Sequence, residues 1–127
     1  VGMGRTEEGL KTALKLLKDI RKEFETNLFI PGSTEGVNIE LEKALRLNDF
    51  ITMGELIAYD ALNRNESCGG HFREEYQTEE GEAKRDDENY FYVSCWEYQG
   101  SDDVAPVLYK EPLVYEAIKV QTRNYKS

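Results

Sequence analysis

The stretch Ala61–Asn89, which reads ALNRNESCGGHFREEYQTEEGEAKRDDEN, decides how the rest of the chain is arranged. It begins at the end of an apolar helical pattern, turns at Gly69–Gly70 and then carries charge on most of its remaining residues. From Glu74 to Glu88 there are eight acids and two bases. A segment that only had to cover a core would not need so many charges, since charged residues are rarely buried unless paired. We interpret residues 66–89 as an acidic lock loop between the preceding helices, the following strands and a partner surface.

Two long helical patterns precede this loop. Thr6 is a suitable N-cap with acids in the next turn, and apolar residues then recur at helical spacing over residues 7–27. Pro31 and its neighbours end this pattern. Asn38 is the next N-cap, and the second helix is expected to run from Ile39 to about Asn65, with Gly69–Gly70 ending it. Residues 7–65 are therefore predicted to form a hairpin of two antiparallel helices.

The second helix has more apolar surface than a single neighbouring helix can cover. One stripe consists of Leu41, Leu45, Ala58 and Leu62, and a second consists of Leu47, Phe50, Met53, Ile57 and Ala61. Since this segment supplies only one other helix, we expect the β part or an absent partner to cover the second stripe. Apolar surface of that extent usually marks an interface.

The last third of the chain is rich in aromatic residues and predicts a β-hairpin. Tyr90–Tyr98 has strand composition, residues 99–103 form a turn, and Val104–Tyr109 is the second strand. Pro106 places that second strand at an edge. Residues 113–127 are expected to be an extended tail, so that residues 90–127 form a hairpin and tail. The predicted fold class is α+β, mainly α, in a single domain.

The charge and composition exclude several functions. The 127 residues carry a net charge of −9, which argues against binding nucleic acid or an anionic membrane surface. No apolar run approaches the roughly 20 residues of a membrane span, so we expect no membrane insertion. The two cysteines are too few for a disulfide scaffold, and we expect free thiols in a reducing compartment.

Three small motifs are weak evidence for chemistry. Cys68 and His71 form a C-x-x-H pair, but a structural zinc site needs four ligands and only Cys95 remains as a soft one, so we expect no metal. Cys68 as a nucleophile would need a base brought to it by the fold, and an idle thiol is the simpler reading. The glycines near the N-terminus lack the dinucleotide spacing, because Glu7 stands where the third glycine is needed.

Arginines and acids at both ends of the loop are the candidate site residues. The simplest interpretation is surface ion pairs worth about 0–1 kcal/mol each, with the adjacent acids solvated rather than catalytic. We favour a partly buried network of charge-assisted hydrogen bonds that pins the loop. Its members are Arg64, Glu66, His71, Arg73, Arg85, Asp86 and Asp87. No catalytic, cofactor-binding or metal-binding residue is predicted.

The segments RNESCGGHFREE at residues 64–75 and RDDEN at residues 85–89 resemble a known family. They are similar to the C-terminal domain of the flavoprotein subunit of succinate dehydrogenase and fumarate reductase, whose pattern is R-x-E-S-R-G-A-H-x-R-E-D, a spacer, then R-D-D-E-N. The chain departs from it at Cys68, where most members have Arg, at Gly70, where they have Ala, and in an insert at residues 77–84. The likeness is specific from about residue 41 to residue 98.

The resemblance implies a parent enzyme that interconverts succinate and fumarate. Such an enzyme holds covalently attached FAD and exchanges electrons with an iron–sulfur subunit on the cytoplasmic, inner face of a membrane. The family's flavin-binding and substrate-binding residues precede this domain, so we expect a fragment that is not catalytic alone and binds no cofactor. Its expected partners are the flavin domain of the same subunit and the iron–sulfur subunit, and its bared surface would also allow self-association.

Two alternatives remain at this stage. One is the C-terminal domain of a related flavoprotein such as L-aspartate oxidase, which needs no iron–sulfur subunit. The other is a free-standing acidic adaptor that binds a partner helix against the second apolar stripe.

Overall fold

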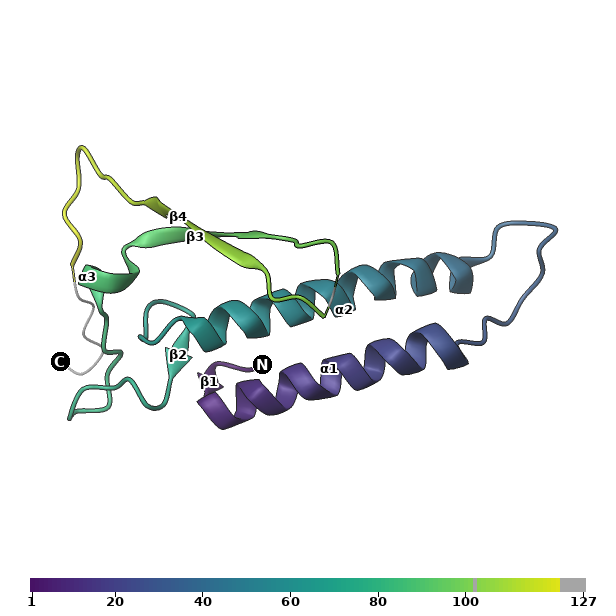
Figure 1. Ribbon diagram of the computed structural model, residues 1–127, viewed down its shortest axis with the longest axis horizontal. Helices are drawn as coiled ribbons and strands as arrows, with labels where there is room; N and C mark the ends of the chain where they lie inside the picture. Colours follow the sequence, from purple (N-terminus) through teal and green to yellow (C-terminus); the bar gives the residue numbers. More distant parts are fainter. Residues whose placement is uncertain (102, 122–127) are drawn as a thin grey trace. The chain divides into compact units, whose positions relative to one another are not determined.

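The computed structural model describes residues 1–101 and 103–121, which divide into two compact units. Residues 1–65 form a helical unit, and the residues from Glu66 onward form a second unit of strands and turns. In chain order the elements are β1 (Gly4–Arg5), α1 (Glu7–Asn27), α2 (Ile39–Asn63), β2 (Phe72–Arg73), α3 (Asp87–Tyr90), β3 (Tyr92–Glu97) and β4 (Val107–Pro112). The predicted class, α+β and mainly α, is confirmed (Figure 1).

Capping residues set the starts of both long helices. Thr6 is extended, and its Oγ accepts a hydrogen bond from the Gly9 N–H at 3.0 Å, so α1 begins at Glu7 as predicted. Asn38 does the same for α2, because its Oδ1 accepts from the N–H groups of Glu40 and Leu41. Helix α2 ends at Asn63, two residues before the predicted end at about Asn65.

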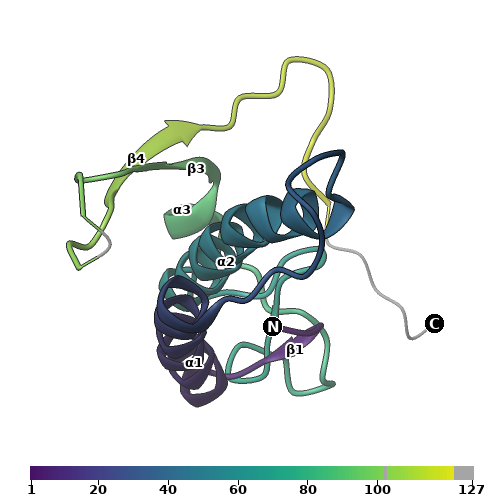
Figure 2. The same ribbon diagram turned by 90° about the vertical axis from the view of Figure 1, so that its right-hand side faces the viewer.

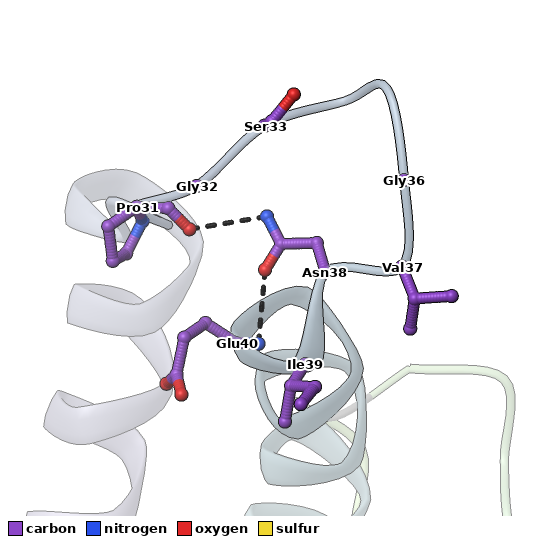
Figure 3. Close-up of a pocket in the computed structure, with 8 residues that line it drawn as sticks. All are labelled: Pro31, Gly32, Ser33, Gly36, Val37, Asn38, Ile39 and Glu40. Carbon is purple, nitrogen blue, oxygen red and sulfur yellow. Dashed lines mark hydrogen bonds between the residues drawn. The ribbon is translucent and has the colours of Figure 1, made fainter.

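The amide nitrogen of Asn38 stabilises the connection between the helices, while its oxygen caps α2. Its Nδ2 donates to the carbonyl of Pro31 at 3.2 Å, across a shallow hollow at the loop tip (Figure 3). Gly32 lies next to this bond with φ at +118°, and a Cβ there would come within 2.7 Å of Asn38 Nδ2. Only glycine fits both the backbone angle and the space.

The two helices run antiparallel and side by side (Figures 1 and 2). Their core consists of the buried residues Leu10, Ala58 and Ala61, with Leu14, Leu17 and Leu62 packed against them. Small residues on α2 let α1 approach closely, and at Gly54 an added Cβ would lie 3.6 Å from a methyl of Leu17. Burying this apolar surface is the main stabilising term of the unit.

The predicted stripes of α2 are only partly correct. Ala61, assigned to the second stripe, is buried in the core with Ala58 of the first, while Leu41 and Leu45 of the first stripe are exposed. The remaining members of the second stripe (Leu47, Phe50, Met53 and Ile57) are 44–65% exposed. The helical unit therefore leaves an apolar face on α2 that its own residues do not cover, and we call these four residues the α2 apolar face. None of the described helices is both long and apolar enough to cross a membrane.

The second unit contains the predicted β-hairpin with different bounds. Strands β3 and β4 pair antiparallel, with Cys95 opposite Tyr109 (Figure 1). Tyr90 is not in the strand but ends α3, a short helix that Asp86 caps by accepting from the Asn89 N–H. The second strand begins three residues later than predicted, at Val107, so that Pro106 precedes it.

Two other expectations concern the turn and the tail. Gly69–Gly70 does not end α2 but forms a tight turn in which Cys68 and His71 exchange main-chain hydrogen bonds of 2.8 and 3.0 Å. Gly69 has φ at +57°, which this turn requires. Residues 113–121 contain no helix or strand. Asp102 of the predicted turn and tail residues 122–127 lie outside the described residues.

Candidate functional site

The centre of the lock loop is Ser67, which is fully buried. Its Oγ accepts a hydrogen bond from the Arg73 N–H at 2.8 Å and donates to the Arg73 carbonyl at 3.1 Å. Its own N–H donates to the carbonyl of Lys84 at 2.9 Å. Ser67 thus connects the turn that follows it to the far end of the loop. The N–H and carbonyl groups that it contacts are hydrogen-bonded without a water molecule.

Glu66 ties the start of the loop to its end. The residue is 2% exposed, and its Oε2 accepts from the main-chain N–H of Asp86 at 2.9 Å. These two residues lie 20 positions apart in the sequence. A hydrogen bond to an ionised acceptor is roughly twice as strong as a neutral one, so this contact favours closure of the loop. Asp86 uses its own carboxylate to cap α3.

Arg73 is the largest buried side chain of the described residues, at 1% exposure. Its Nε donates to Glu75 Oε2 at 3.1 Å, and its guanidinium carbon lies 5.4 Å from the ring centre of Tyr76. The N–H of Tyr76 in turn donates to the Arg73 carbonyl at 2.9 Å. Charge pairing and the aromatic face together make burial of this arginine tolerable.

Arg85 lies at the outer side of the loop. Its Nε and one terminal nitrogen donate to the same Asp87 oxygen at 3.0 and 2.6 Å, and the other terminal nitrogen donates to the Gln121 carbonyl at 3.3 Å. The hydrogen bond to Asp87 raises the pKa of Arg85 above its ordinary value. The Arg85 side chain is 21% exposed and the Asp87 side chain 51%, so water reaches the carboxylate of this pair and weakens the attraction.

The remaining predicted residues lie at the margins. His71 is partly buried, and its main chain closes the tight turn with Cys68. Arg64 is partly buried in the helical unit, where its N–H donates to the Asp60 carbonyl and caps α2. Cys68 and Cys95 are free thiols, the first partly buried and the second exposed.

The described residues offer little for binding a cofactor or a metal. No group of three or more His, Cys, Asp or Glu in the described ranges is arranged to hold a metal ion. The first turns of the described α-helices carry acids: Glu7 and Glu8 in α1, Glu40 and Glu42 in α2, Asp87 and Glu88 in α3. Because helix N-termini bind phosphates through their N–H groups and positive dipole ends, these acids oppose a pyrophosphate there.

Three residues of this site were missed from the sequence: Ser67, Glu75 and Tyr76. Serine at position 67 has an available signal, because it precedes a Gly–Gly turn where a short polar side chain can bond to nearby main chain. Glu75 was grouped with the solvated acids, and nothing in its surroundings in the sequence distinguishes it from Glu74. Nothing in the sequence around Tyr76 indicates that its ring contacts the guanidinium of Arg73.

Comparison with known proteins gives matches of three kinds, to a family, to a curated protein and to solved structures. The sequence model of the family described as fumarate reductase flavoprotein C-terminus matches residues 1–125. An uncharacterized FAD-dependent oxidoreductase of Methanocaldococcus jannaschii is 32% identical over 76 residues, which is 60% of this chain and 13% of that protein. The FrdA chain of E. coli quinol fumarate reductase is similar in structure with a TM-score of 0.75 at 22% identity, over 95% of this chain and 20% of that one.

Proposed function

Because this chain belongs to the fumarate reductase flavoprotein C-terminal family, we propose that it is the structural and interface domain of a flavin-dependent oxidoreductase that interconverts succinate and fumarate. The observation that carries the proposal is the family match over nearly the whole chain. The curated relative, described as FAD-dependent, supports the flavin. Since this chain spans 13% and 20% of the proteins it matches, the activity is proposed for the whole protein and not for this domain.

In this proposal the flavin is bound outside these residues. The acidic first turns of α1, α2 and α3 do not suit a pyrophosphate, and the described sheet of β3 and β4 is an antiparallel pair rather than a parallel dinucleotide-binding sheet. The contribution of this chain is mechanical. The bonds of Ser67, Glu66 and Arg73 keep the lock loop in one conformation, so that the surface it presents is preorganised for a partner.

The partners follow from the same assignment. The α2 apolar face would be covered by the flavin domain of the same subunit, because an uncovered apolar surface of this kind usually marks an interface. The iron–sulfur subunit would exchange electrons with the flavin, which places the assembly at the inner, cytoplasmic face of a respiratory membrane.

A related flavoprotein remains the second candidate, because the description of the curated relative includes the flavin but neither succinate nor fumarate. An L-aspartate oxidase would use the same cofactor without an iron–sulfur subunit.

The test is to isolate the native protein with an antibody raised against residues 1–127 and to measure three properties. We expect the captured material to show flavin absorbance and to contain iron and sulfide. We also expect it to reduce an acceptor dye when succinate is added, or to oxidise a reduced dye when fumarate is added. Activity with L-aspartate and no iron would favour the second candidate. A captured protein with no flavin and no activity on any of the three substrates would refute the proposal and favour a free-standing adaptor.

A further inference from the structure

A polar cluster lies at the contact between α1 and α2. Arg21 of α1 reaches three residues of α2: its guanidinium donates to Asn48 Oδ1 at 3.5 Å, to Thr52 Oγ at 3.1 Å and to a carboxylate oxygen of Glu55. The side chains of Arg21 and Glu55 are only 12% and 20% exposed. This ion pair is therefore much less accessible than the helix-surface pairs of the same chain.

The apolar part of the contact does not by itself select one alignment of the helices. Leu10, Leu14 and Leu17 of α1 lie at spacings of four and three residues, and they pack over Gly54, Ala58 and Ala61 of α2, which have the same two spacings. If α1 slid by one helical turn along α2, two of the three leucines would still meet a small residue. Rows that repeat at helical spacing are prone to such slippage.

The polar part differs because a single side chain of α1, Arg21, meets a set of acceptors on α2. The three acceptors on α2 occupy positions i, i+4 and i+7, so they share one face and converge on a single guanidinium. Thr52 is oriented as an acceptor, because its hydroxyl donates to the Asn48 carbonyl at 3.1 Å. Moving Arg21 by one turn toward the N-terminus of α2 would take it away from Glu55, and moving it by one turn the other way would take it away from Asn48.

We infer that Arg21 and its acceptors fix the register of the helical hairpin, and thereby fix which residues form the α2 apolar face. Buried ion pairs contribute little net stability compared with apolar residues of similar size, and specifying a register is the best-supported use of such groups. The inference goes beyond the proposed function, because it holds whichever protein covers the face.

The test compares two double variants in the full chain, with Cys68→Ser and Cys95→Ser as background. Spin labels are placed at Thr12→Cys and Asp49→Cys, both exposed, and their distance distribution is measured by electron paramagnetic resonance. The variant Arg21→Leu with Glu55→Leu removes the buried pair. Its matched control, Arg46→Leu with Glu42→Leu, removes an exposed pair of the same residue types.

We expect the background and the control to give one distance population, and the Arg21 variant to give a second one displaced by up to the helix pitch of about 5.4 Å. Helical content by circular dichroism should stay the same. A single unchanged population in the Arg21 variant would overturn the inference. Loss of the folded state would overturn it as well, because the inference requires the apolar contacts to hold the pair together.

Discussion

Replacing Ser67 with alanine is the most direct perturbation of the lock loop. The side chain is fully buried and its Oγ makes two hydrogen bonds to the main chain of Arg73. The Arg73 carbonyl keeps a second bond from the Tyr76 N–H, so most of the loss falls on the Arg73 N–H, whose bond to Oγ is the shorter one at 2.8 Å. Removing the acceptor of a buried N–H costs about 1–3 kcal/mol, and we expect Ser67→Ala to lower the free energy of unfolding by that amount.

The chain contains its own probe for this measurement. Its single tryptophan, Trp96, lies in β3 of the unit that holds Ser67, so urea unfolding followed by tryptophan fluorescence reports on this unit. The matched control is Ser101→Ala in the same unit, where the hydroxyl accepts from the Asp103 N–H at 3.2 Å in an exposed turn. We expect the control to change the free energy of unfolding by less than about 0.5 kcal/mol. Equal, small effects of both substitutions would refute the reasoning that burial makes the Ser67 bonds important.

Four further substitutions test other parts of the structure. Gly54→Ala should stabilise the helical unit by about 0.5–1 kcal/mol in thermal unfolding, because alanine favours a helix and its methyl group would lie at an ordinary contact distance. Gly32→Ala should destabilise the same unit by about 1–3 kcal/mol, because the backbone at this position has a positive φ. Arg85→Ala should cost about 0–1 kcal/mol in thermal unfolding, since the carboxylate that Arg85 pairs with is half exposed to water; a larger loss would contradict this. The hydrogen bond to Glu97 raises the pKa of the Tyr109 hydroxyl above 10, so its stabilisation is present below pH 10 and lost as the pH rises through the folded value. Glu97→Gln should lower that pKa in a 13C NMR titration of labelled tyrosine, and an unchanged pKa would contradict the assignment.

Short-range signals account for the parts of the fold that were predicted correctly. The starts of α1 and α2 depend on Thr6 and Asn38, whose side chains bond to N–H groups two or three residues away. Such contacts can be read directly from the sequence. The hairpin could likewise be predicted from strand composition on both sides of a polar turn.

The parts that could not be predicted depend on contacts between distant residues. Ala61 was assigned to an uncovered stripe because the direction from which α1 approaches α2 cannot be read from a helical pattern. The start of β4 depends on its pairing register with β3, and the cap that Asp86 supplies makes Tyr90 the end of a helix rather than the start of the predicted strand. At the candidate site a partly buried network was predicted, but the sequence does not show that Arg73 is more deeply buried than Arg85.

The central claim is that the α2 apolar face is an interface within a larger flavoprotein. Hydroxyl-radical footprinting tests it directly, because oxidation of Phe50 and Met53 reports on their access to solvent. Both side chains are more than half exposed in the helical unit. We expect rapid oxidation of these residues in the separate 127-residue chain and strong protection in the native assembly. Equal oxidation in the two preparations would contradict it.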